Sequence, residues 1–400
     1  MISDEDDVRT LLRASPVPPT RLDADLLLAR GRRSKRRWRR ATIAAAALAV
    51  VAAAVPAVTI AARIDRDREQ PANSRFATKP RVVHRGTTVA GTLWCDPTPL
   101  PTPAGQPGGD TVTAADPTGT YVIGGPTVWT RAEPTVITVP TVRTEVTATA
   151  VNGNGTVVAH DSGLNWRITN GAVQELAAPA GWNRARVLHV NSKGDALGLL
   201  DGAADRTAPQ SALVVWPADH PDRPRIIRET DSQPLAVRDD GTTVSARIRS
   251  EADLGAGSIT INRPNGTRTS IPVPRELTGH GSMLNATVHG DFLYSSYANN
   301  EITYSDGVTS LANPYLYPVR WNLRTGLIEV FDALDGAPVG GPGGWFVAAE
   351  DLAGKLVLVA PDRTTHRFPI DGGRVRAVAA AGTTLAGFAD PTPVTWNCTR

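Results

Sequence analysis

The feature of this sequence that most constrains its fold is a repeated unit of apolar strand, tight glycine turn and second apolar strand. In residues 150–160, AVNGNGTVVAH, the turn glycine is Gly155. The turn glycines of the seven units are Gly119, Gly155, Gly194, Gly241, Gly290, Gly344 and Gly382. They lie 36 to 54 residues apart, and a period of about 40 to 50 residues built from strands is typical of a β-propeller.

Each unit also contains a second hairpin. Asn170-Gly171 and Asn265-Gly266 stand between short apolar stretches, and Asn-Gly is the strongest short signal for a hairpin turn. Residues 321–330 and 356–368 repeat the pattern. Two hairpins in each unit predict four-stranded blades.

Seven turn glycines predict an all-β, seven-bladed β-propeller. Only 18 residues follow Gly382 (400 − 382 = 18), enough for a third strand at 393–398 but not for a fourth. We expect residues 81–95 to supply the missing strand, because pairing the two ends of the chain closes the ring without open edges. Eight blades result if 81–95 begins a blade of its own, and six if Gly290 or Gly344 is not a blade turn.

The chain has two cysteines, Cys95 and Cys398, which nearly bracket the repeats. An even pair of cysteines in an oxidising compartment predicts one disulfide. This bond would join the two ends of the propeller covalently. The alternative, a metal pair, needs further ligands at short spacing, and none accompanies either cysteine.

A single apolar segment sets the predicted topology. Residues 41–62 carry no charge over 22 positions, which is long enough for a helix to cross a bilayer. Residues 30–40 hold eight basic side chains, so the N-terminus should stay in the cytoplasm. The rival interpretation is a signal peptide cleaved near Val55-Pro56-Ala57. The domains expected are a cytoplasmic basic stub (1–40), a transmembrane helix (41–62), a juxtamembrane linker (63–80) and an extracellular propeller (81–400).

The net charge of +3 is the sum of a basic N-terminal part and a slightly acidic remainder of the chain. Residues 1–40 hold 11 of the 42 Lys and Arg and 6 of the 39 Asp and Glu, leaving 31 basic against 33 acidic residues beyond them. This balance gives no electrostatic case for nucleic-acid binding. Only four lysines stand against 38 arginines, a bias typical of GC-rich bacteria such as actinobacteria.

Five tryptophans are expected on the third strand of their repeats. They are Trp129, Trp166, Trp216, Trp321 and Trp396. Aromatic faces can stack on saccharides, but a regular place in the repeat favours packing between blades, where large side chains bury much area.

The stretch that contains residues 152–160, Asn165-Trp166 and 171–176 resembles the bacterial extracellular repeat named for its His-Ala-Phe triplet. Residues 190–198 with 213–216 are similar to a second copy. The triplet itself is absent from both. The resemblance implies a WD40-like propeller and an extracellular location, and it implies no catalytic residues.

No catalytic, cofactor or metal motif emerges from the sequence. Gly279–Met283 only superficially resembles a nucleophile elbow, and the seven histidines form no metal-binding pair at short spacing. We therefore expect no cofactor and favour a non-catalytic binding or scaffold module at the cell envelope, with an envelope protein or glycan as its partner. The alternatives are a glycan-acting enzyme with its site in the funnel, and a transmembrane signalling protein that acts through residues 1–40.

Overall fold

The part of the chain that carries the repeats is described in a computed structural model. It covers residues 76–400 apart from 78, 104–111, 141–145, 162, 204–210, 249–255, 278–282, 300–301, 306–307, 312–314, 351–354, 369, 371–372, 380–381, 390–391 and 400. The stub, the apolar segment 41–62 and most of the linker 63–80 lie outside these residues. Among the residues described, no helix has the length and apolar character needed to span a bilayer.

Seven blade sheets and one two-stranded sheet make up the described part of the fold, and the first four blades follow one another along the chain. Each is an antiparallel meander whose strands pair in sequence order. Blade 1 is β4 (Val112–Ala115), β5 (Tyr121–Gly124), β6 (Thr127–Thr130) and β7 (Glu133–Val136). Blade 2 is β8 (Thr147–Val151), β9 (Val157–His160), β10 (Asn165–Thr169) and β11 (Ala172–Glu175). Blade 3 is β12 (Trp182–Val190), β13 (Ala196–Ala203), β14 (Ser211–Trp216) and β15 (Arg225–Ile227). Blade 4 is β16 (Ser232–Val237), β17 (Thr243–Ile248), β18 (Ala256–Asn262) and β19 (Arg268–Pro272).

The last three blades each take an additional strand from the N-terminal side of the repeats. Blade 5 is β20 (Met283–His289), β21 (Phe292–Asn299), β24 (Tyr315–Asn322) and β25 (Leu327–Phe331), with the hairpin β22 (Ile302–Ser305) and β23 (Val308–Leu311) inserted. Blade 6 is β26 (Asp335–Gly340), β27 (Phe346–Ala349), β28 (Leu356–Val359) and β29 (Thr364–Arg367). Blade 7 has β30 (Gly373–Ala379), β31 (Thr384–Ala389) and β32 (Thr392–Thr399). Short 3-10 helices are η1 (Arg275–Leu277) and η2 (Pro342–Gly344).

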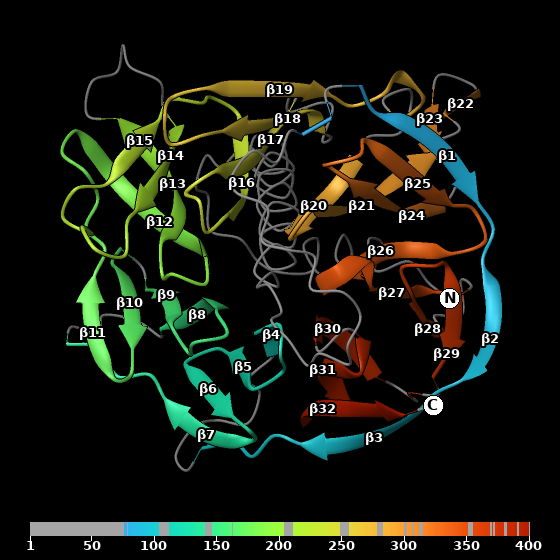
Figure 1. Ribbon diagram of the computed structural model, residues 1–400, viewed down its shortest axis with the longest axis horizontal. Helices are drawn as coiled ribbons and strands as arrows, with labels where there is room; N and C mark the ends of the chain where they lie inside the picture. Colours follow the sequence, from blue (N-terminus) through green and yellow to red (C-terminus); the bar gives the residue numbers. More distant parts are fainter. Residues whose placement is uncertain are drawn as a thin grey trace, which may run out of the picture. The chain divides into compact units, whose positions relative to one another are not determined.

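The seven blades close into a ring through their first strands. In order, β4, β8, β12, β16, β20, β26 and β30 each contact the next, and β30 contacts β4 (Figure 1). The all-β, seven-bladed propeller is therefore confirmed, and the alternatives of six and eight blades are wrong. All seven turn glycines lie between the first and second strands of their blades, and all have positive φ, from 57° to 94°. At Gly382 a Cβ atom would lie 2.6 Å from the Trp345 ring, so a side chain is excluded there by space as well as by φ.

The strand that completes blade 7 differs from the one expected. It is β3 (Trp94–Pro99), which pairs antiparallel with β32, rather than the whole of 81–95. The preceding residues form β1 (Arg81–Arg85) and β2 (Thr88–Thr92), which add to blades 5 and 6 as parallel fifth strands. We call β1, β2 and β3 together the N-terminal belt, because they follow one another along the outside of three blades (Figure 1).

The predicted disulfide closes this belt onto the C-terminus. Cys95 and Cys398 are directly opposite each other in the β3–β32 ladder and are bonded, with a sequence separation of 303 residues. The ends of the propeller are thus held by backbone pairing and by a covalent bond together.

The five tryptophans lie on third strands and pack between blades, as expected. Each is at most 3 % exposed. Trp321 of blade 5 belongs to the same buried cluster as Leu235 and Val244 of blade 4, and Trp216 of blade 3 belongs to the same cluster as Ala150 of blade 2. Burial of this extent excludes sugar stacking on these rings.

Arginines that are buried (Arg167, Arg320) or partly buried (Arg225) form a second connection between neighbouring blades. Each crosses to the next blade and donates to the carbonyl of its turn glycine and to carbonyls that follow its third strand. Arg167 donates to the carbonyls of Gly194, Pro217 and Ala218 at 3.0, 3.2 and 2.8 Å. Arg225 donates to those of Gly241 and Arg263 at 2.7 and 3.5 Å. Arg320 donates to those of Gly344, Ala360 and Pro361 at 2.7, 3.0 and 3.0 Å. We call these three residues the inter-blade arginines. They donate to carbonyls in the turns of the next blade, of which those of Arg263 and Ala360 also accept from the backbone at Gly266 N and Arg363 N.

Candidate functional site

The turns that follow the first strands of blades 2 to 5 are joined side by side by hydrogen bonds. Asn152 Nδ2 donates to the Asn191 carbonyl at 2.7 Å. Asn191 Nδ2 donates to the Arg238 carbonyl at 2.9 Å, and Arg238 Nη2 donates to the Gly290 carbonyl at 2.8 Å. One side chain from each turn therefore fixes the backbone of the next turn around this end of the ring.

A pocket of about 290 Å³ lies at these turns. It is lined by residues 189–190, 236–239 and 288–291, which are the ends of β12, β16 and β20 and the residues that follow them. Valines at positions 190, 237 and 288 give it apolar walls, and the charged groups stand in the turns. Apolar walls with a few placed polar groups are typical of a small-molecule site.

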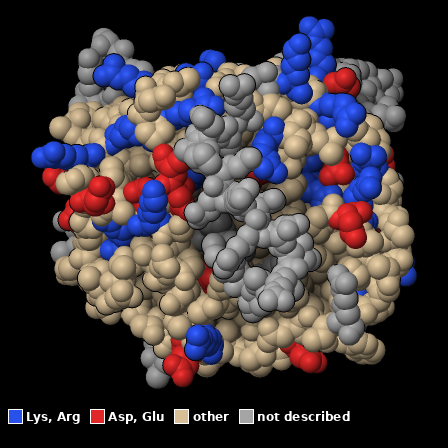
Figure 2. All heavy atoms as spheres, viewed as in Figure 1, with Lys and Arg blue, Asp and Glu red and all other residues tan. Residues whose placement is uncertain are grey.

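The charged groups of the pocket are held by one another and by backbone. Arg238 Nη2 donates to Asp291 Oδ1 at 2.9 Å, and Arg324 Nε lies 3.6 Å from Asp291 Oδ2. Asp239 accepts from Ser192 N at 2.9 Å and from Ser192 Oγ at 2.6 Å. On the face of the propeller seen in Figure 2, acidic and basic side chains are interspersed. The pocket therefore offers charges of both signs that are held by hydrogen bonds.

His189 supplies a neutral imidazole to the pocket wall. Its side chain is buried, and Nε2 lies 3.2 Å from the Pro234 carbonyl. A carbonyl only accepts, so Nε2 carries the hydrogen and Nδ1 is an acceptor. Among the described residues, Nδ1 has no hydrogen-bond partner. Burial lowers the pKa of His189 to about 4, because the imidazolium would lose its hydration.

His289, at the end of β20, also lines the pocket. It packs edge-on against Tyr294, with ring centroids 5.9 Å apart. Tyr294 Oη donates to the Gly341 carbonyl at 2.8 Å, and burial raises the pKa of the Tyr294 phenol. The phenol therefore stays protonated and serves as a structural donor to blade 6.

The burial of His189 predicts an acid-sensitive propeller. The pKa of His189 is about 4 in the folded protein, against the ordinary histidine value of 6.5 that applies in the unfolded chain. As the pH falls, the unfolded chain is therefore protonated at this histidine before the folded protein is. The stability that neutral His189 contributes is present above pH 6.5 and is lost as the pH falls toward 4, where the loss is about 3 kcal/mol.

The measurement is the urea midpoint at several pH values between 7 and 4, for the wild type and for His189→Gln. We expect the difference in free energy of unfolding between the two proteins to shrink on acidification. Parallel pH profiles would contradict a buried neutral imidazole.

The structure brings together residues that the sequence left apart. His189 and His289, considered scattered, line one pocket, and Asp239 of the predicted turn Asp239-Asp240 lines it with them. Elsewhere, His84 pairs with Asp332 at 2.9 Å between β1 and the end of blade 5. Within the described residues, no group of three or more His, Cys, Asp or Glu side chains is placed to hold a metal ion.

No known protein family matches the sequence, and no curated protein is similar to it. Three solved structures illustrate its similarities in fold. A streptogramin B lyase aligns over 76 % of this chain and 98 % of its own, at 12 % identity and a TM-score of 0.48. Virginiamycin B lyase from Staphylococcus aureus aligns over 77 % of this chain and 99 % of its own, at 15 % identity and a TM-score of 0.48. The Neurospora crassa Pan2 WD40 domain aligns over 76 % of this chain and 94 % of its own, at 14 % identity and a TM-score of 0.43. Similarities this distant carry no argument about activity.

Proposed function

We propose that this chain is a single-pass bacterial membrane protein whose extracytoplasmic propeller binds a small polar group of an envelope protein or glycan, without catalysis. The observation that carries the proposal is the pocket at the ends of β12, β16 and β20. Its size suits one sugar ring or the end of a peptide. Its charged side chains are engaged in fixed hydrogen bonds, an arrangement that favours recognition over reaction.

The anchoring part of the proposal is supported by the charge-free stretch 41–62, by the basic block before it and by the disulfide. Disulfides persist in oxidising compartments and are rare in the cytosol. The propeller would accordingly lie outside the membrane and the stub 1–40 inside.

Binding can be tested with a pair of matched substitutions. Gly290 lines the pocket and Gly266 lies in the β18–β19 turn. Both have positive φ, 57° and 83°, and a Cβ atom at either would meet nothing within 4 Å. Asparagine tolerates this conformation, so Gly290→Asn places a side chain at the pocket with little strain and Gly266→Asn is its control.

The purified full-length protein would be screened by thermal shift and calorimetry against monosaccharides, N-acetylated amino sugars and short peptides. We expect a ligand that stabilises the wild type and Gly266→Asn, and binds Gly290→Asn at least tenfold more weakly. Equal affinity for the two variants would place the site elsewhere. Conversion of the bound ligand to a product would support the glycan-acting enzyme instead.

A further inference from the structure

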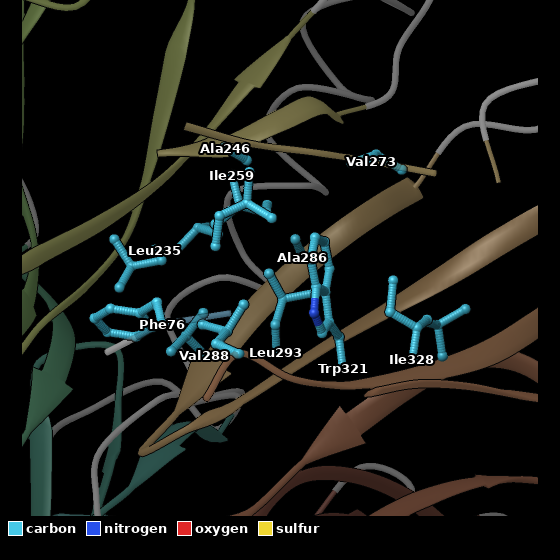
Figure 3. Packing of buried hydrophobic residues seen from close by; sticks show 14 of the residues in the cluster. Phe76, Leu235, Ala246, Ile259, Val273, Ala286, Val288, Leu293, Trp321 and Ile328 are labelled. Atoms are coloured by element: carbon cyan, nitrogen blue, oxygen red, sulfur yellow. The ribbon is translucent and has the colours of Figure 1, made fainter. Parts of the chain in front are cut away.

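The chain enters the propeller beside the pocket, at Phe76. The Phe76 side chain is buried, and it belongs to the apolar cluster that joins blades 4 and 5. Figure 3 shows its ring next to Leu235 of β16 and Val288 of β20. Val288 is also a pocket wall. The first described residue of the linker is therefore docked between the same two blades that form one side of the pocket.

Arg238 contacts both the linker and the pocket. Its guanidinium carbon lies 4.6 Å from the centre of the Phe76 ring, within the range of a cation–π interaction. The same guanidinium donates through Nη2 to Gly290 and Asp291 of the pocket. Any shift of Arg238 that changes its bonds in the pocket also changes its contact with Phe76.

A second set of contacts joins Asp291 to the residues that follow Phe76. The Asp291 carbonyl accepts from Leu323 N at 2.8 Å, and the Leu323 carbonyl accepts from Ala77 N at 3.1 Å. The next bond in this region runs from Arg81 N to the Gly326 carbonyl at 2.8 Å. The β24–β25 turn thus holds Ala77 and Arg81 and is itself held by Asp291. We call the described residues 76–77 and 79–81 the entry segment.

Arg238 has a reason to move when a ligand binds. Its Nε is buried and has no hydrogen-bond partner among the described residues, and an unpaired buried donor is costly. A ligand oxygen that draws the guanidinium into the pocket satisfies this donor, and it does so at the expense of the contacts with Asp291 and Phe76.

We infer that occupation of the pocket and docking of the entry segment are coupled, so that the propeller reports its ligand through its own linker. This inference rests on the proposed function, because it takes residues 63–75 to lead to the membrane. The two states are the docked entry segment seen in the structure and a released one. The ligand that favours release carries an oxygen acceptor, a carboxylate or a carbonyl. Coupling between two sites is reciprocal and is typically worth a factor of 5 to 150.

The test uses the full-length protein in detergent micelles and hydrogen–deuterium exchange of peptides that cover residues 76–81. The reporters are the amides of Ala77 and Arg81, which are bonded to the β24–β25 turn. In Asp291→Asn the loss of charge weakens the hold on Arg238 and Arg324, and we expect exchange of the entry segment to rise 5- to 100-fold. The control is Asp239→Asn, which alters a pocket carboxylate bonded to Ser192 rather than to Arg238.

A second pair of variants tests the reverse direction. Phe76→Leu keeps an apolar side chain but removes the aromatic face, and Phe76→Tyr keeps the face. We expect faster exchange of residues 286–291 in the leucine variant and recovery in the tyrosine variant. If Asp291→Asn fails to fold, Arg324→Gln takes its place, because Arg324 is half-exposed and touches the same carboxylate.

Unchanged exchange at 76–81 in folded Asp291→Asn, or an equal rise in Asp239→Asn, would overturn the coupling. Either result would leave the binding proposal standing, because the comparison of Gly290→Asn with Gly266→Asn measures affinity without reference to the linker. Conversely, equal ligand affinity of Gly290→Asn and Gly266→Asn would place the binding site elsewhere, and the exchange results for Asp291→Asn and Asp239→Asn could still be interpreted without it.

Discussion

Replacing Cys95 and Cys398 by serine is expected to lower the free energy of unfolding by about 5 kcal/mol. The bond closes a loop with a sequence separation of 303 residues, and the chain-entropy model assigns about 5 to 6 kcal/mol to a loop of that length. Six backbone positions of β3 still pair with β32 in the variant, so we expect the ring to form but to open first at blade 7.

The measurement is urea unfolding of the double serine variant beside the wild type, with and without reductant. Reductant should lower the midpoint of the wild type and leave the variant unchanged. A loss below about 1 kcal/mol would mean that β3 and its neighbours hold the ring closed without the covalent bond, or that the unfolded chain is already compact.

Replacing Arg320 by methionine is expected to cost about 3 to 5 kcal/mol. Arg320 is 2 % exposed, and it donates to Glu329 Oε2 at 2.9 Å and to three carbonyls of blade 6. Its guanidinium also lies 5.4 Å from the centre of the Phe331 ring. Methionine removes the hydrogen-bonded partner of the buried Glu329 carboxylate and leaves it the longer contact with Arg85 Nε at 3.6 Å, and removing one member of a buried pair is costly.

Two further variants separate the charge from the carbonyl contacts. Arg320→Met with Glu329→Gln removes the buried carboxylate charge as well, and we expect it to recover part of the loss. Arg167→Met in blade 2 removes similar carbonyl contacts, but its side-chain partner is the neutral Gln174, so we expect a smaller loss. An equal loss in Arg167→Met and Arg320→Met would show that the carbonyl contacts, and not the ion pair, account for the stability.

The repeats were readable from the sequence because they are local. A glycine with positive φ between two apolar strands is a pattern within ten residues, and it located the turn of every blade. The third-strand tryptophans followed from the same register. The disulfide followed from the even pair of cysteines in an oxidising compartment, and the shortage of strands at the C-terminus led independently to the same closure.

The N-terminal belt was only partly predictable because it depends on long-range pairing. Residues 81–95 look like one strand by local pattern, but β1 pairs with Leu327–Phe331 and β2 with Thr364–Arg367, which lie more than 200 residues away. Leu93, 5 % exposed, is buried in the core shared with blade 7, where β2 gives way to β3. No composition signal marks these divisions.

The candidate site was missed because the turns differ in length. His189 lies five residues before its turn glycine, and His289 lies one residue before its own. Aligning the repeats on the turn glycines therefore separates two side chains that the strands bring to one pocket. Aligning the ends of β12 and β20 instead would have placed them within one position of each other.

The central claim is a propeller outside the membrane whose two ends are joined at Cys95 and Cys398. The most direct test is to treat intact cells with a thiol-alkylating reagent, digest the protein without reduction and identify the cysteine peptides by mass spectrometry. The account predicts one disulfide-linked pair of peptides and no alkylated cysteine. Recovery of both cysteines as alkylated thiols would contradict the covalent closure of the ring and the oxidising location together.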